Sequence, residues 1–517
     1  MSTPPPDQLN PARPELSPAR RWGALGVLTA SLLVIIMDMT ILNIALPEMA
    51  VELQPTSDQQ LWIVDVYSLV LAGLLVSFAA IADRWGRKRM LMLGYALFAV
   101  ASLLVLIADT PEAVIAIRAL LGIGGAMIMP TTLSLIRVIF TNPRERATAL
   151  SIWGAVSGIG AAIGPVVGGL LLEFFSWHAA FLVNVPLMVV AVIAGLLVLP
   201  ESRVAHPGRW DFVAAALSLV GMTLLVWSIK VFGEHASFLV PEALLALLAS
   251  LALLTWFGIR CVRSDAPLLD LTLFRSRPFS AGVIAALGST FAFVAALLLL
   301  TQWIQVVAGR SPVETGLLLL PVALASAVSS LAAPVLARFI GARAVLGGGI
   351  GVAGLGMMLL GLQPGALTVT AVVISTVLIG AGTGSLAIAS ALIMHGSPEE
   401  KAGNAGAIEE TSYELGAVLG VAILGSIAAL LYRAGLEASS VLDGLAPTAA
   451  TELESSLGGA MAVADQLGRP ELLAQAGAAF TESMQVTGIV GGIIMIVAAA
   501  AVFVMTPKGT DVTSVSH

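Results

Sequence analysis

Charged residues are scarce in this chain. They make up 11% of its 517 residues, whereas hydrophobic residues make up 58%. A soluble protein of this length needs far more charge to cover its surface, so the composition excludes the soluble class and leaves repeated membrane spanning. The net charge of −7 identifies no partner, because charge in a membrane protein is sorted by the side on which each loop lies.

Cysteine and histidine are also rare, with one and five residues. The single Cys261 excludes an internal disulfide, and the scattered histidines lack the spacing of metal ligands. We therefore expect neither a metal site nor a cofactor, and nothing in the chain indicates nucleic-acid binding. Residues 1–18 are Pro-rich and polar, so we expect no cleavable signal.

Long apolar runs are what the chain has in abundance. Fourteen of them are long enough to cross about 30 Å of hydrocarbon. The expected spans are 22–46, 59–80, 90–107, 112–136, 148–171, 179–199, 210–231, 241–262, 279–304, 314–338, 344–362, 367–394, 402–432 and 481–505. The sequence therefore predicts an all-α polytopic membrane protein with 14 transmembrane helices.

Basic residues predict the orientation of these spans. If the N-terminus lies inside, most of the 25 lysines and arginines fall in inner loops, and the turn "GRKR" at 86–89 is the densest group. Cytoplasmic loops carry such an excess. We expect a multi-pass protein of the cell membrane with both termini in the cytoplasm.

Two basic turns suggest an internal duplication. "ADRWGRKRMLMLG" joins the second and third spans, and "ARFIGARAVLGGG" joins the tenth and eleventh, 255 residues later. Duplicated halves around a midplane site are typical of secondary transporters. The expected divisions are a cytoplasmic tail at 1–21, a six-helix lobe at 22–200, two inserted helices at 201–278, a second six-helix lobe at 279–505 and a tail at 506–517.

One outer loop, 434–480, is much longer than the others. Its segments "TAATELESSLGGAMAVADQL" and "PELLAQAGAAF" are typical of amphipathic helices, the second starting at Pro470. Two interpretations of this loop remain. It is a solvated segment that rests on the outer surface without a function of its own, or it forms a gate or a contact with a partner.

Ionisable residues inside the spans are the main functional signal. A carboxylate in the hydrocarbon costs several kcal/mol, roughly 3 on insertion scales, and usually marks a functional site. These residues are Asp38 in "SLLVIIMDMTILNIALP", Asp65 in the second span, Arg118 in the fourth, and Glu409, Glu410 and Glu414 in the thirteenth. Glu410 and Glu414 share a helix face, whereas Glu409 points about 100° away.

Two readings of these acids stay open. Asp38 or Asp65 pairs with Arg118 and locks helices together, or the acids exchange protons and bind a cationic ligand. One arginine cannot neutralise five acids, so the surplus must be protonated, exposed to water or matched by a cation.

Glycine and proline give a second signal in the fifth span, "GAVSGIGAAIGPVVGG". Gly154 and Gly158, and Gly164 and Gly168, are spaced for close helix contact, and Pro165 bends the helix. This segment is either a static packing contact or a contact that flexes.

Asp83, within the basic turn, can pair with an arginine in one conformation and release it in another.

These pieces resemble the major facilitator superfamily and, within it, the fourteen-span drug–proton antiporters. The resemblance rests on "MDMTILNIALP", "QQLWIVDVYSLVLAG", "ADRWGRKR", "IRALLGIGGAMIMPTTLSLIRVIF", "GPVVGG", "FSWHAAFLVNVP" and "AGNAGAIEETSYELG". It implies a major facilitator fold in which two six-helix lobes and two inserted helices form an alternating-access antiporter. Such a protein expels lipophilic cations with the inward proton gradient.

The resemblance also implies roles for residues. Asp38 belongs to the span-1 motif, and Arg118 is the span-4 arginine implicated in proton transfer. The implied roles of the remaining sets are a conformational latch (Asp83, Arg84, Gly86, Arg87), the antiporter motif (Gly164, Pro165, Gly168, Gly169), and substrate or proton handling (Glu409, Glu410, Glu414). Leu121 departs from the family pattern, which often has glutamine there.

The expected cargo is small lipophilic cations such as quaternary ammonium antiseptics and cationic dyes, carried by a monomer in the bilayer. The tenth span has no acid after Glu314, and Ser326 lies on its small-residue face. We therefore expect monovalent cations to be preferred over long bis-cations. A same-fold exporter or symporter of a lipid, a siderophore or a nutrient is the alternative, and an enzyme or channel is disfavoured because no nucleophile–base pair or filter repeat is present.

Overall fold

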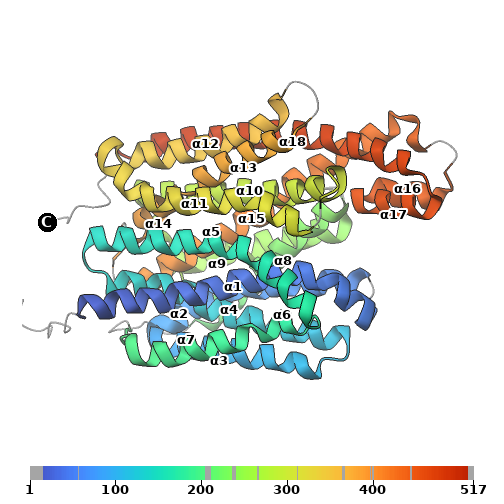
Figure 1. The fold of residues 1–517 in the computed structure, drawn as a ribbon. Helices are drawn as coiled ribbons and strands as arrows, with labels where there is room; N and C mark the ends of the chain where they lie inside the picture. The colour runs from blue at the N-terminus through green and yellow to red at the C-terminus, as the bar shows by residue number, and fades with distance from the viewer. Residues whose placement is uncertain are drawn as a thin grey trace, which may run out of the picture.

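The computed structural model describes residues 16–55, 57–203, 211–235, 240–264, 267–310, 312–363, 367–395, 397–398, 401–442 and 445–509. Every regular element in this part of the chain is helical (Figure 1). Both described ends of the chain lie at the same end of the bundle, which we call the termini end. The predicted all-α architecture is confirmed.

The first group of helices forms the N-terminal lobe. Its elements are α1 (Pro18–Leu53), α2 (Ser57–Trp85), α3 (Arg87–Leu103), η2 (Leu104–Ile107), α4 (Pro111–Ile139), α5 (Pro143–Phe174), α6 (Ala179–Leu182) and α7 (Asn184–Val198). Local signals set where two of these helices start. Thr110 and Asn142 each accept a hydrogen bond from a backbone N–H of the first turn and precede a proline at the first helical position.

The second group forms the C-terminal lobe, with two further helices before it. The two preceding helices are α8 (Phe212–His235) and α9 (Pro241–Arg263). The lobe contains η3 (Leu271–Arg275), α10 (Arg277–Gln302), η4 (Trp303–Val307), α11 (Pro312–Ile340), α12 (Ala342–Leu362), α13 (Val369–Thr383), α14 (Leu386–His395), α15 (Ala402–Glu437), η6 (Ser440–Leu442), α16 (Pro447–Ser455), α17 (Leu457–Leu467) and α18 (Pro470–Met505).

Thirteen segments among the described residues are long and apolar enough to cross a membrane. Helix α5 is outside this set, but its 32 residues run parallel to α1 and pack between α1 and α11 (Figure 1). Two expected spans are broken helices. The span at 179–199 comprises α6 and α7, and the span at 367–394 comprises α13 and α14.

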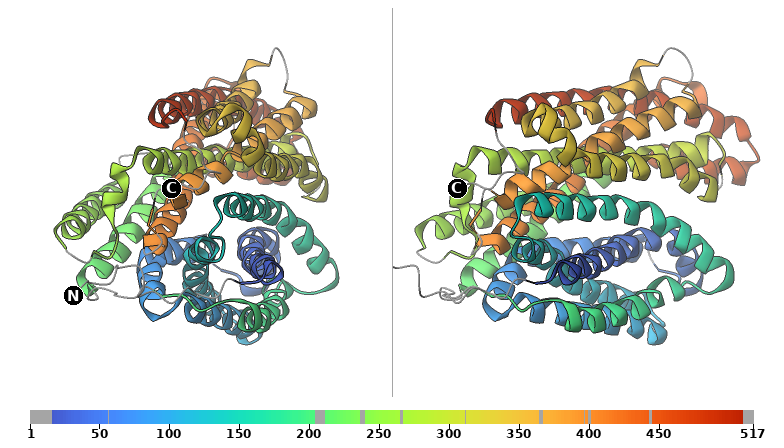
Figure 2. Two further views of the ribbon diagram at one scale, coloured as in Figure 1. Left: turned by 90° about the vertical axis from the view of Figure 1, so that its left-hand side faces the viewer. Right: turned by 60° about the vertical axis from the view of Figure 1, so that its left-hand side comes forward.

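The two lobes meet along two seams. Helix α5 packs against α11 on one side of the bundle, and α2 packs against α15 on the other. Helix α8 contacts both α2 and α15, and α9 packs on α8. Figure 2 shows this pair beside the second seam when the bundle is viewed from the termini end. The inserted helices therefore cover one lobe boundary.

The two basic turns noted in the sequence have the same backbone design. Gly86 separates α2 from α3 with a φ of 124°, and Gly341 separates α11 from α12 with a φ of 83°. Glycine adopts positive φ without the steric penalty that other residues meet. Each turn thus reverses the chain within one residue, and the internal duplication stays a prediction.

The long loop at 434–480 is mostly helical. Helix α15 continues to Glu437, and the segment starting at Pro470 is the first part of the 36-residue α18 rather than a separate helix. The other expected helix is divided into α16 and α17 at Ser456, which caps α17 by accepting a hydrogen bond from the Gly459 N–H. Four apolar residues of α17 are buried, so the loop packs on the end of the bundle opposite the termini end (Figure 1).

Glycine makes the contact between α1 and α5 possible. A Cβ on Gly164 would overlap the Thr40 hydroxyl and lie 3.0 Å from the Met37 carbonyl oxygen. A Cβ on Gly160 would lie 3.2 Å from Ile36 Cβ. On Gly169 of the same helix, a Cβ would meet nothing within 4 Å.

We predict that Gly164→Ala destabilises the protein, because the added methyl group overpacks the α1–α5 contact at a typical cost of about 1–3 kcal/mol. Gly169→Ala is the matched control on the same helix and should keep the wild-type melting temperature. Thermal unfolding of both variants in detergent checks this. Equal melting temperatures for the two variants would contradict the assigned contact.

Candidate functional site

Asp38 and Arg118 form a buried ion pair between α1 and α4. The distance between Asp38 Oδ2 and Arg118 Nη1 is 2.8 Å, and the two side chains are 3% and 2% exposed. Asp38 lies twenty residues after Pro18 in α1, about 30 Å of helix from the termini end. The acid in the first span therefore has a partner, and that partner is Arg118.

Neighbouring polar groups hold this pair in place. Asn184 Nδ2 donates to Asp38 Oδ1 at 2.6 Å, and Arg118 Nε donates to the Ile63 carbonyl oxygen at 3.2 Å. The Arg118 guanidinium also lies 4.5 Å from the centroid of the Tyr67 ring. Buried ion pairs are tolerated only when such hydrogen bonds satisfy the remaining donors and acceptors.

Asn184 was not singled out in the sequence. It is fully buried and is the first residue of α7, within the motif "FLVNVP". A lone amide side chain in an apolar span could have marked it, because a buried polar group needs a hydrogen-bond partner. Its partner could not be read from the sequence, since Asp38 lies 146 residues away.

Glu409 and Glu410 form a second buried group, on α15. Both are 0% exposed. Glu409 Oε1 accepts a hydrogen bond of 2.6 Å from the Tyr413 hydroxyl, and Ser390 of α14 lies beside the same carboxyl group. Neither oxygen of Glu410 has a hydrogen-bond partner among the described residues.

The charges that act on Glu410 come from Glu409 and Glu414, and both are acidic. An unpaired carboxylate buried in a low-dielectric interior is costly. Glu410 therefore requires a proton, a cation or water. Glu409 lies seven residues after Ala402, about 10 Å from the termini end, so this group and the Asp38 pair sit at different depths.

Glu414 and Tyr67 lie between the two groups. Glu414 is half-buried, and Tyr67 of α2 is within electrostatic range of Asp38, Arg118 and Glu414. Asp65 belongs to α2, but its side chain lies outside the described ones, as does that of Pro165. Tyr67 of the second span is thus near the Asp38–Arg118 pair and Glu414, and Glu414 in turn acts on Glu410.

The expected latch lies where α2 meets the C-terminal lobe. Arg87 Nη2 is 2.8 Å from Asp83 Oδ1, and Arg87 Nη1 donates to Ser202 Oγ at 3.1 Å. A Cβ on Gly403 of α15 would overlap the Asp83 carboxyl group. Asp83 is therefore packed against the start of α15, and Gly86 supplies the turn that brings Arg87 to it.

Further contacts join the lobes at the termini end. Arg137 Nη2 donates to the Ser397 carbonyl oxygen at 2.7 Å, and Arg146 Nη2 is 3.4 Å from His395 Nδ1. Together with the Asp83 contact, they hold the two lobes against each other at this end.

Ser326 lies at the contact between α11 and α13. It is 6% exposed and accepts a hydrogen bond of 2.8 Å from the Thr383 hydroxyl. Its role in specificity stays a prediction. The antiporter-motif glycines Gly164 and Gly168 are buried, and Gly169 is half-buried.

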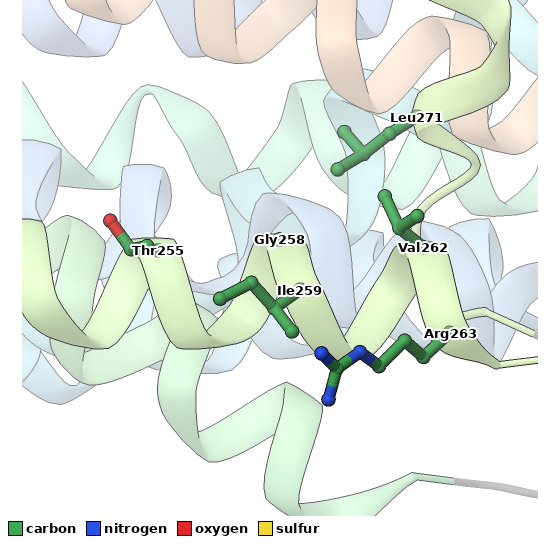
Figure 3. Close-up of a pocket in the computed structure, with 6 residues that line it drawn as sticks. All are labelled: Thr255, Gly258, Ile259, Val262, Arg263 and Leu271. Atoms are coloured by element: carbon green, nitrogen blue, oxygen red, sulfur yellow. The ribbon is translucent and has the colours of Figure 1, made fainter.

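A groove on α9 lies apart from both acid groups (Figure 3). It is lined by Thr255, Gly258, Ile259, Val262, Arg263 and Leu271. All of these residues belong to α9 except Leu271, which belongs to η3. The lining is mostly apolar and comes from one inserted helix, so we assign it no part in the site.

We predict that Arg118→Gln destabilises the protein strongly, because it leaves Asp38 buried without a counter-charge, a loss of about 3–5 kcal/mol. Adding Asp38→Asn to that variant removes the orphaned charge and should recover much of the lost melting temperature. Thermal unfolding of the two single variants and the double variant measures this coupling. A double variant that is less stable than both single variants would show that the two charges do not compensate each other.

Comparison with known proteins agrees with this arrangement. The sequence profile of the Major Facilitator Superfamily matches residues 28–421. The multidrug efflux pump LfrA of Mycolicibacterium smegmatis is 39% identical, and the match covers 94% of this chain and 96% of LfrA. The methyl viologen resistance protein SmvA of Salmonella typhimurium is 36% identical, and the match covers 87% of this chain and 90% of SmvA.

Two more distant proteins match as well. The tetracenomycin C resistance and export protein of Streptomyces glaucescens is 33% identical over 79% of this chain and 76% of its own length. The crystal structure of the human organic anion transporter MFSD10 (TETRAN) shares the fold, with a TM-score of 0.59 and 15% identity over 93% of this chain and 100% of that one. The predicted fold class is confirmed, and the chain is a multi-pass membrane protein that belongs to the Major Facilitator Superfamily.

Proposed function

We propose that this protein is a proton-coupled multidrug efflux antiporter that exports lipophilic organic cations by alternating access. The observation that carries the proposal is the pair of fully buried acids Glu409 and Glu410, of which Glu410 has only acidic groups acting on it. Such a site is neutralised by protons when empty and by a cation when loaded. Exchange of the two is antiport.

The distribution of basic residues supports a cytoplasmic position for the termini end. The turn with Arg84, Arg87 and Lys88 lies there, and cytoplasmic loops are enriched in lysine and arginine. In this orientation the lobes are in contact on the cytoplasmic side through Asp83 and Arg137. Cations from the cytoplasm reach Glu409 and Glu410 when these contacts break.

The Asp38–Arg118 pair has a separate part in this scheme. It lies farther from the cytoplasm than Glu409 and is held by Asn184. Protonation of Asp38 from the outer side would release Arg118. Arg118 also contacts the Tyr67 ring, and Tyr67 is within electrostatic range of Glu414 on α15. The two acid groups then act as outer and inner proton sites of one cycle.

Energetics agree with proton-driven export. Moving one positive charge out against 100 mV, inside negative, costs about 2.3 kcal/mol. One proton moving inward offsets that electrical cost and leaves the pH gradient to drive the cation outward.

The names of the relatives favour toxic organic compounds as cargo. They include a multidrug efflux pump and a methyl viologen resistance protein. Methyl viologen is a dication, and the neighbouring residues Glu409 and Glu410 supply two carboxyl groups. Both points weigh against the expected preference for monovalent cations. The compounds used to test transport must therefore include both monovalent and divalent cations.

We predict that purified protein in liposomes releases protons when ethidium, tetraphenylphosphonium or methyl viologen is added to the side that carries the termini. An enclosed pH-sensitive dye measures the release, and collapse of the proton gradient should stop dye accumulation. Glu410→Gln deletes the titratable group and should abolish proton release while the protein still folds. Glu471→Gln, which changes an exposed acid on the opposite end, is the control.

Cation transport that continues without a gradient and without proton release would instead indicate a uniporter. Transport of tetracenomycin-like neutral compounds with no response to cations would favour the alternative of a different exporter of the same fold.

A further inference from the structure

Trp153 and Tyr413 stack across the boundary between the lobes. Their ring centroids are 6.2 Å apart and their planes are inclined by 26°. Trp153 belongs to α5 and is 4% exposed, whereas Tyr413 belongs to α15. Each ring is therefore carried by a different lobe.

The stack adjoins the buried acids. The Tyr413 hydroxyl donates to Glu409, and Glu410 is the next residue on the same helix. Polar atoms that need partners also gather here, since Trp153 Nε1 and both carboxyl oxygens of Glu410 are buried and have none among the described residues. Most buried polar groups in proteins are hydrogen-bonded, so this concentration calls for an explanation.

We propose that Trp153 and Tyr413 form the two walls of a subsite for flat aromatic cations, with Glu409 and Glu410 as its negative charge. The subsite rests on the efflux function proposed above and defines which cations that function favours. Aromatic faces attract cations and stack on flat rings. A tetraalkylammonium ion has no flat ring, so it uses the acids and gains little from the walls.

The position of the rings on opposite lobes gives the subsite a loading step. In this structure the lobes touch at the termini end, and the rings stack on each other. When the lobes part, Trp153 moves away from Tyr413 and a flat cation can take the place of the facing ring. While the subsite is empty, the Tyr413 hydroxyl donates a hydrogen bond to the Glu409 carboxyl group.

Binding of two cations to the purified full-length protein tests this subsite. Ethidium is the flat aromatic probe, and tetrabutylammonium is the aliphatic probe. We expect Trp153→Leu and Tyr413→Leu to raise the Kd of ethidium about tenfold and that of tetrabutylammonium less than about twofold. Trp153→Phe and Tyr413→Phe keep a ring and should stay within about threefold for both probes.

A matched aromatic control lies at the opposite end of the bundle. Tyr432 and Phe480 have the same centroid separation of 6.2 Å, with planes inclined by 75°. Phe480→Leu removes a ring of similar size and should leave both Kd values unchanged. Melting temperatures show which variants are folded, and the variants on α5 and α15 test the two walls independently.

Equal weakening of both probes, or no change for ethidium, would overturn the subsite while leaving cation efflux in place. Wild-type protein that binds and exports neither probe would overturn the subsite together with the proposed function.

Discussion

A charge buried in this bundle needs a counter-charge, a hydrogen-bond partner or a proton, and the rest of the structure depends on this constraint. In the N-terminal lobe the constraint is met within the protein, because Asp38 contacts Arg118 and Asn184. In α15 it is not met by protein cations, because Glu410 is surrounded by acidic charge. An unpaired buried carboxylate is costly, and the proposed exchange of protons and organic cations rests on this second arrangement.

Helix α15 connects this chemistry to the movement of the lobes. Its first turns contain Gly403 and Gly406, where a Cβ would approach Asp83 and the Pro130 carbonyl oxygen of the other lobe. The acids follow within two turns. Any separation of the lobes at the termini end therefore moves Glu409 relative to α2 and α4, so access to the acids and the conformation of the protein change together.

Much of the fold could be predicted from local sequence patterns. Apolar runs identified the spans, since hydrocarbon thickness sets a minimum helix length. The sequence also paired the two basic turns, and in the structure each contains a glycine with positive φ, Gly86 and Gly341. The sequence predicted a helix starting at Pro470 but not its continuity with the last span, because the apolar run that marks the span begins only near 481. The two parts form one helix, and α18 packs against α15 and α17.

The sequence by itself determined which helices carry acids and how deep each acid lies, because hydropathy and helical rise are local properties. The tertiary structure decided that Arg118 contacts Asp38, that Asn184 supports this pair, and that Trp153 faces Tyr413. These partners lie 80 to 260 residues apart. Their contacts depend on how each helix is rotated and crossed against its neighbours, and packing across the whole bundle sets that rotation.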